Sequence, residues 1–293
     1  MTLSTTRSPV RAFCRAYPLT SMSGTDTTDT LYLRDGDAFV GTAATKGAWH
    51  DDGQSGGAVL ALLGHVLEDV PTLSAMSLSR LTVDIVRPVP IGRRLHIATE
   101  VIREGKKIQI VDLTLTAGDT VTTRARALRI RDLDISALDD MPESTSAVNP
   151  SSHLPPPEEL PSVEHLPGVA DFLRHGAEMR RTTEPIDGVH AVWCRLRVPV
   201  VEAEPVRASS LAALPLDIVN LLGAMFDPTR VTCINPDVSG HLSRGPVGEW
   251  VALTGHTYFS HAVAHGVSMA VMSDEAGPFG TASVSQILQP TTT

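Results

Sequence analysis

The chain has 293 residues, of which 42% are hydrophobic and 19% are charged. This composition predicts a globular protein with room for two domains of about 100–150 residues each. Its net charge of −9 argues against a nucleic-acid partner, because binding to phosphates requires a clustered basic face. No run of about 18 apolar residues occurs, so no membrane-spanning helix is expected. The three cysteines are far apart in sequence, which predicts the reduced thiols of a cytoplasmic protein rather than a disulfide framework.

Two segments of biased composition divide the chain. Residues 1–29 are rich in Ser and Thr and are expected to form a disordered tail, with Met22 as an alternative start to Met1. Residues 139–167 contain seven prolines and predict a linker, because proline is poorly compatible with a helix interior or a central strand. We therefore predict an N-terminal domain at residues 30–138 and a C-terminal domain at residues 168–293.

The N-terminal domain shows one helical pattern between strand patterns. Residues 31–44 predict two strands that are joined by the turn at Asp35–Asp37. Residues 58–67 are apolar on every side, which predicts a buried helix that starts after a pair of glycines. Further strands are expected around the alternating apolar residues 81, 83 and 85, and at residues 95–103, 108–117 and 121–131.

The C-terminal domain repeats this order of signals. We expect strands at residues 171–181 and 191–200, a helix at 211–226, a short segment at 236–241, and strands at 250–259, 264–273 and 280–288. The interval from Arg87 to Gly118 equals the interval from Arg244 to Glu275, which indicates an internal duplication.

One apolar helix followed by a meander of antiparallel strands is the plan of a hotdog fold. A sheet that wraps around its helix buries that helix on nearly every side, which is what the sequence requires here. The prediction is an α+β double hotdog with two antiparallel sheets, each wrapped around a long apolar helix. Because open sheet edges favour pairing, we also expect a homo-oligomer.

Several segments carry a family resemblance that covers about residues 31–288. They are Gly47–Trp49, Gln54–Gly57, Leu81–Pro90, Arg103–Gln109, Asp217–Asn220, Ile234–Asp237 and Gly248–Val251. In this order they resemble the acyl-CoA thioesterase family of tandem hotdog proteins, which is related to thioesterase II, and in particular its actinobacterial branch.

The resemblance implies a site in which a carboxylate and neutral polar side chains hold the attacking water. The carboxylate corresponds to Asp217, and the position of a family hydroxyl corresponds to Asn235, which can accept or donate a hydrogen bond but carries no hydroxyl. The family's last-strand glutamine aligns with Val284 or Ser285 rather than with Gln286, so Ser285 is taken as the third candidate. From the residues alone, Asp217 after Pro215 is better explained as a cap near the start of a helix.

Other polar residues are candidates for substrate binding. Gln54, Gly56 and Gly57 stand where the first helix begins, and free amides at a helix start can bind a developing oxyanion. The alternative is a tight glycine turn with a solvated Gln54. Asn220 lies one helical turn from Asp217 and either orients that carboxylate or caps locally.

The basic pair Lys106 and Lys107 is either a solvated turn or a contact to the phosphates of CoA. The histidines of the second half, which do not have metal-ligand spacing, predict structural or exposed roles: His241, His256, His261 and His265.

These observations predict hydrolysis of acyl-CoA thioesters without a metal or redox cofactor. Two alternatives stay open at this point. One is a protein that binds acyl-CoA or an acyl carrier without turnover, since Asn235 lacks a hydroxyl and Gln286 is out of register. The other is an enoyl-thioester hydratase or dehydratase, which would need an Asp/His pair near the helix that the sequence does not show. Neither the acyl chain length nor the carrier can be read from the residues.

Overall fold

The computed structural model describes residues 29–135, 137, 154–166, 168–186, 189–222 and 230–290. All but the last residue of the expected tail at 1–29, and more than half of the expected linker at 139–167, fall outside these ranges. The first half contains the following elements in chain order: β1 (Tyr32–Asp35), β2 (Ala38–Gly41), α1 (Gly56–Leu67), β3 (Met76–Ile85), β4 (Arg94–Arg103), β5 (Ile108–Ala117) and β6 (Thr120–Arg131).

The second half follows the same plan. Its elements are β7 (Ala177–Arg181), β8 (His190–Leu196), α2 (Ala208–Ile218), β9 (Val231–Ile234), β10 (Asp237–Leu242), β11 (Val251–Ser260), β12 (His265–Asp274) and β13 (Gly277–Pro290). A short 3-10 turn, Val219–Leu222, continues from α2. The strands predicted from alternation are therefore present in both halves, and most of their ends lie within a few residues of the expected positions.

All the strands belong to one antiparallel sheet in the order β1-β2-β4-β5-β6-β3-β10-β13-β12-β11-β8-β7, with β9 paired to β13. Each half contributes six strands of this path, and the order of the second half mirrors that of the first. The two halves join where β3 pairs with β10, with Leu81 opposite Gly240. This pairing hydrogen-bonds the inner edge of each half to the other, so neither edge is left open.

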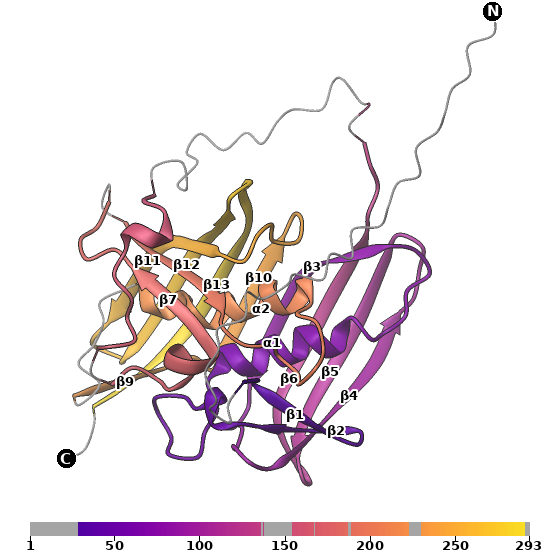
Figure 1. Ribbon diagram of the computed structural model, residues 1–293, viewed down its shortest axis with the longest axis horizontal. Helices are drawn as coiled ribbons and strands as arrows, with labels where there is room; N and C mark the ends of the chain where they lie inside the picture. The colour runs from indigo at the N-terminus through magenta and orange to yellow at the C-terminus, as the bar shows by residue number, and fades with distance from the viewer. Residues whose placement is uncertain are drawn as a thin grey trace, which may run out of the picture.

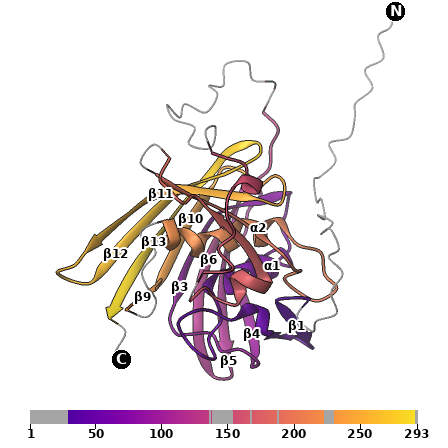
Figure 2. The same ribbon diagram turned by 60° about the vertical axis from the view of Figure 1, so that its left-hand side comes forward.

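The two helices lie side by side between the magenta and yellow halves of the sheet (Figures 1 and 2). All of α1 after its first residue is buried, which explains why its sequence is apolar on every side. The start of each helix is capped by a carboxylate from the end of the other helix. The Gly57 amide at the start of α1 donates to Asp217, and the Ser209 amide at the start of α2 donates to Glu68. The helices are therefore antiparallel.

Two segments of the second half differ from the sequence prediction. The strand expected at residues 171–181 begins only at Ala177, because Phe172–Gly176 forms a π-helical turn that buries Phe172 and Leu173. The helix expected at 211–226 begins earlier, at Ala208, and gives way to the 3-10 turn after Ile218. Residues 223–229 of that prediction lie outside the described ranges.

The described end of the predicted linker packs against the second half. Leu160 and Val163 are buried, and the indole Nε1 of Trp193 donates a 3.1 Å hydrogen bond to the Pro155 carbonyl. This part is therefore a packed connection. The domain boundaries themselves stay a prediction, as do the homo-oligomer and the cytoplasmic location.

Candidate active site

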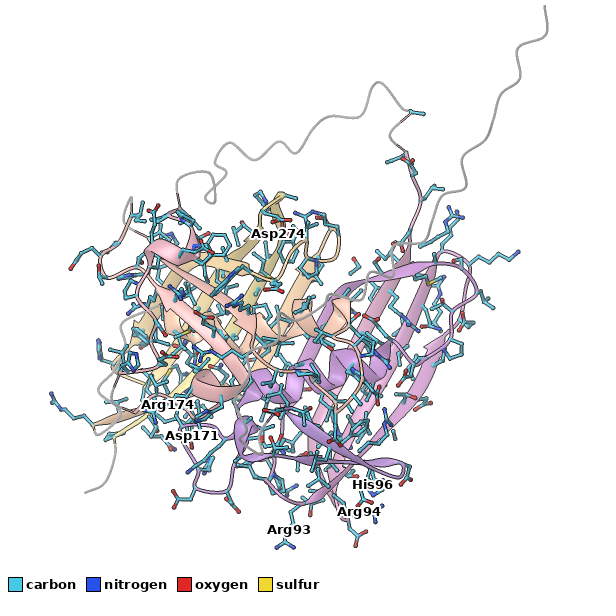
Figure 3. All side chains as sticks on the ribbon, viewed as in Figure 1. Arg93, Arg94, His96, Asp171, Arg174 and Asp274 are labelled. Carbon is cyan, nitrogen blue, oxygen red and sulfur yellow. The ribbon has the colours of Figure 1, made fainter. Side chains whose placement is uncertain are left out.

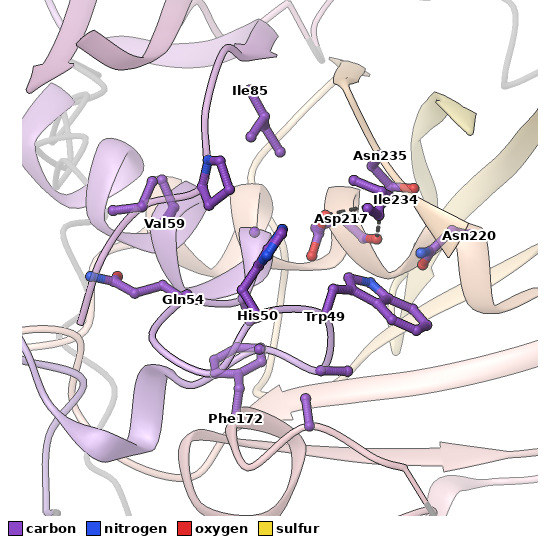
Figure 4. A pocket seen from close by; sticks show the side chains of 18 of the residues that line it. Trp49, His50, Gln54, Val59, Ile85, Phe172, Asp217, Asn220, Ile234 and Asn235 are labelled. Carbon is purple, nitrogen blue, oxygen red and sulfur yellow. Dashed lines mark hydrogen bonds between the residues drawn. The ribbon is translucent and has the colours of Figure 1, made fainter. Parts of the chain in front are cut away.

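A cavity of about 450 Å³ lies where the start of α1 meets the end of α2 (Figure 4). Its walls come from both halves of the chain: the loop before α1, the segment between β3 and β4, the π-helical turn, and the segment from α2 to β10. Most of the lining side chains are apolar, among them Val59, Ile85, Phe172, Ile218 and Ile234. Such a concave, largely apolar space with a few polar groups is typical of a small-molecule site.

The loop before α1 is held in place by a partly buried network around Gln54. Its side-chain oxygen accepts a 2.6 Å hydrogen bond from the Tyr32 hydroxyl, and its Nε2 donates a 2.8 Å hydrogen bond to the Pro90 carbonyl. Its backbone amide donates to the Val89 carbonyl. Gln54 does line the cavity, as expected, but its amide is engaged in fixing the wall of the cavity.

The two glycines at the start of α1 are required by close approaches. A Cβ on Gly56 would lie 2.4 Å from Oδ1 of Asp217, and a Cβ on Gly57 would lie 2.9 Å from Cε1 of Phe172. The absence of side chains therefore lets a carboxylate and an aromatic ring pack directly against the helix start. The first amides of a helix have no intrahelical acceptor, and that of Gly57 donates a 2.8 Å hydrogen bond to Oδ2 of Asp217.

Asp217 lies in the last turn of α2, not near its start as the sequence suggested. Pro215 stands inside this helix, which buried packing holds together despite the missing amide. The carboxylate accepts two hydrogen bonds, from Gly57 and from Nδ2 of Asn235 at 3.0 Å. Burial raises the pKa of the Asp217 carboxyl above its ordinary value, and these two hydrogen bonds offset that rise only in part.

Asn235, rather than Asn220, orients the carboxylate. Nδ2 of Asn235 also donates to the Asp217 carbonyl at 2.9 Å, so one amide fixes both the backbone and the side chain. Its Oδ1 is buried without a hydrogen-bond partner. Asn220 lines the cavity from the 3-10 turn, and within the described contacts it makes no hydrogen bond to Asp217 (Figure 4).

Sequence reasoning missed a hydroxyl in this cavity. Thr123 on β6 is fully buried and lines the cavity, and its Oγ1 has no hydrogen-bond partner. Cys233 also lines the cavity, but burial raises the pKa of its thiol to about 11, so it is protonated at neutral pH and is a poor nucleophile.

Three predicted residues are not brought to the cavity. Lys106 and Lys107 are exposed in the turn after β4, and the Lys106 carbonyl accepts a hydrogen bond from Ser74, beyond the C-terminal end of α1. Ser285 is exposed on the outer face of β13. Gln286, on the inner face, is buried and donates to the Ser268 hydroxyl, but it does not line the cavity either.

No group of three or more His, Cys, Asp or Glu side chains suited to a metal ion occurs among the described residues. In the same part of the chain, no helix is long and apolar enough to cross a membrane.

Comparison with known proteins finds a family match within the first half of the chain. Residues 45–130 match the family model of the acyl-CoA thioesterase N-terminal domain. This segment contains the start of α1 and the first-half walls of the cavity. No curated protein matches the chain.

Solved structures show the fold of the whole chain. A putative thioesterase from Novosphingobium aromaticivorans has a TM-score of 0.67 at 20% identity, covering 88% of this chain and 98% of its own. A protein with a hot dog fold from Alicyclobacillus acidocaldarius has a TM-score of 0.65 at 15% identity, with coverages of 92% and 100%. The acyl-CoA thioesterase II of Mycobacterium marinum has a TM-score of 0.60 at 14% identity, with coverages of 88% and 95%.

The predicted double hotdog fold is thereby confirmed, except that the two predicted sheets are hydrogen-bonded into one continuous sheet where β3 pairs with β10. The chain thus has the double hotdog fold, and its residues 45–130 are similar to the acyl-CoA thioesterase N-terminal domain.

Proposed function

We propose that this protein hydrolyses acyl-CoA thioesters in the cavity between its two halves, with Asp217 as the general base. The observation that carries the proposal is the carboxylate itself, half-buried at an apolar cavity, with its pKa raised and its two oxygens held by Gly57 and Asn235. A base whose pKa is raised toward the working pH is better matched to proton transfer than an ordinary carboxylate. The family match of the first half supports the same chemistry.

In the proposed reaction, Asp217 accepts a proton from water while the water oxygen forms a bond to the thioester carbonyl carbon. The carbon–sulfur bond then breaks, and the proton passes from Asp217 to the departing thiolate. A free acid and a thiol leave, and the carboxylate is restored. The negative charge that develops on the carbonyl oxygen requires a donor nearby.

The start of α1 is the proposed donor. The Gly57 amide is engaged by Asp217, so the Gly56 amide, which belongs to a residue that lines the cavity, is assigned to the carbonyl oxygen. The positive end of the helix dipole adds to this stabilisation.

Two unpartnered oxygens are assigned to the attacking water. Oδ1 of Asn235 is an acceptor without a donor, and Oγ1 of Thr123 can both accept and donate. Thr123 thus supplies the hydroxyl that Asn235 lacks. Buried polar atoms of this kind carry a cost unless water or a ligand satisfies them.

The test is turnover of acyl-CoA, measured as release of the free thiol. Asp217→Asn keeps the size of the side chain and removes the base, and we expect kcat to fall by about 10²–10⁴-fold. Asn220→Ala is the matched control, because it alters the cavity lining without touching the carboxylate. Unchanged turnover in Asp217→Asn would disprove the mechanism. A wild-type protein that binds an acyl-CoA without releasing thiol would instead be a binding protein.

A further inference from the structure

Arg87 stands out among the groups that line the cavity. Of the described lining residues, it is the one permanent cation, and Asp217 is the one carboxylate. The Arg87 side chain is exposed, and its only hydrogen bond within the described contacts runs from Nη1 to the Val121 carbonyl at 3.4 Å. No carboxylate of the described residues lies within ion-pair distance of it, although the chain as a whole is acidic.

The duplicated half shows how an arginine at this position is held when its role is structural. Arg244 occupies the same place before β11 that Arg87 occupies before β4. It forms a two-pronged ion pair with Asp274, at 2.6 and 2.7 Å, and also donates to the Gly277 carbonyl at 3.0 Å. The Asp274 carboxylate is fully buried. Such paired hydrogen bonds fix a guanidinium firmly.

The first half lacks that carboxylate. Asp274 is the last residue of β12, and the last residue of the equivalent ten-residue strand β5 is Ala117. Both strands pair with the strand that follows the arginine, β11 in one half and β4 in the other. The guanidinium of Arg87 therefore has no carboxylate that corresponds to Asp274, and it lies beside the cavity that it lines.

We infer that Arg87 binds the phosphate of a phosphopantetheine thioester whose acyl end enters the cavity. This rests on the proposed function, because it names the carrier chemistry of the same site. A guanidinium with free donors matches the geometry of a phosphate, and a partly exposed position suits the polar arm that stays outside an apolar cavity. The phosphate belongs either to CoA or to the prosthetic arm of an acyl carrier protein, since both share this arm.

The test is binding of thioether analogues that cannot be hydrolysed, by calorimetry, to the wild-type protein and to Arg87→Gln. The ligands are an S-alkyl-CoA, the same alkyl group on a carrier protein, and S-alkyl-pantetheine, which has no phosphate. We expect Arg87→Gln to weaken binding of the preferred phosphate ligand about tenfold and to leave the pantetheine ligand within about twofold. The phosphate ligand that binds the wild-type protein more tightly identifies the carrier.

Two further variants sharpen the test. Arg93→Gln removes the same charge from an exposed site six residues along the chain, which points away from the molecule (Figure 3), and should leave all affinities within about twofold. Ala117→Asp supplies the carboxylate that the second half has, and should weaken phosphate binding as Arg87→Gln does.

The inference is overturned if Arg87→Gln binds the phosphate ligands as tightly as the wild type. It is also overturned if all three ligands weaken equally, because Arg87 would then shape the cavity without contacting phosphate. These outcomes are separate from the fate of the proposed function. Arg87-dependent binding without turnover would refute hydrolysis alone, and normal turnover with phosphate-ligand affinities that do not change in Arg87→Gln would refute only this inference.

Discussion

Gly56 lies so close to Asp217 that the effect of Gly56→Ala on the free energy of unfolding should depend on whether the Asp217 side chain is present. A Cβ at residue 56 would lie 2.4 Å from Oδ1, 2.6 Å from Cγ and 2.8 Å from Oδ2 of Asp217. Overpacking of this kind costs about 1–3 kcal/mol, and the higher helix propensity of alanine returns at most about 1 kcal/mol. We therefore expect Gly56→Ala to lower the free energy of unfolding by about 0–2 kcal/mol. Displacement of the carboxylate should also lower kcat about hundredfold.

In an Asp217→Ala background the obstacle is absent, so the same Gly56→Ala change should be neutral or should stabilise by up to about 1 kcal/mol. The double-mutant cycle should then give a coupling free energy of about 1–3 kcal/mol, measured by urea unfolding of the four proteins at one pH. Gly57→Ala is the matched control, because its nearest obstacle is Phe172 and its cost should persist in both backgrounds. An equal cost of Gly56→Ala in both backgrounds would refute the reasoning.

Three further outcomes can be measured on single variants. Burial raises the pKa of Asp217, and this base works only when it is ionised. We therefore expect kcat/KM to rise with pH through a pKa above that of an ordinary carboxyl. A pH–rate profile with no such step would contradict the assignment of Asp217 as the base. Thr123→Val removes a buried hydroxyl that has no hydrogen-bond partner, so the free energy of unfolding should change by less than about 1 kcal/mol. We expect kcat to fall about tenfold in this variant. A large loss of stability with kcat intact would show that the role of Thr123 is structural. Tyr32→Phe leaves the partly buried oxygen of Gln54 without its donor and should cost about 0.5–1.5 kcal/mol in urea unfolding, and no cost would show that the cavity wall does not depend on that hydrogen bond.

The sequence predicted the strands well because each follows a simple alternation, and it predicted α1 because the helix is apolar on all sides. It located Asp217 through a family resemblance but misplaced it within α2. Pro215 is typical of a helix start, and only the packed structure shows that it lies inside the helix. The sequence predicts a strand where Phe172–Gly176 forms a π-helical turn, because short runs of apolar residues do not distinguish the two structures.

The missed residues of the cavity have a physical explanation as well. On β6, Thr122 and Thr123 are both buried because the register with β5 shifts there, and such an irregularity breaks the alternation that sequence reasoning relies on. Of the two interpretations of Lys106 and Lys107, the structure fits the solvated turn, because β4 lies between these residues and the cavity. Ten residues of strand span about 33 Å, a distance that local sequence cannot reveal.

The two helix junctions hold carboxylates in similar contacts but in different surroundings. At both junctions a carboxylate accepts a hydrogen bond from the second residue of a helix, Asp217 from Gly57 and Glu68 from Ser209. Only the first lines the cavity, and burial raises the pKa of its carboxyl; Glu68 is exposed.

Loss of the carboxylate should therefore have opposite consequences at the two helix junctions. Glu68→Ala should cost about 1 kcal/mol of stability, as the loss of a helix cap does, and leave kcat within about twofold. Asp217→Ala should abolish turnover at little cost in stability, because a buried carboxylate with a raised pKa opposes folding at neutral pH. Urea unfolding and thiol release on both variants test this division of roles, and a loss of turnover in Glu68→Ala would show that the two junctions are coupled rather than specialised.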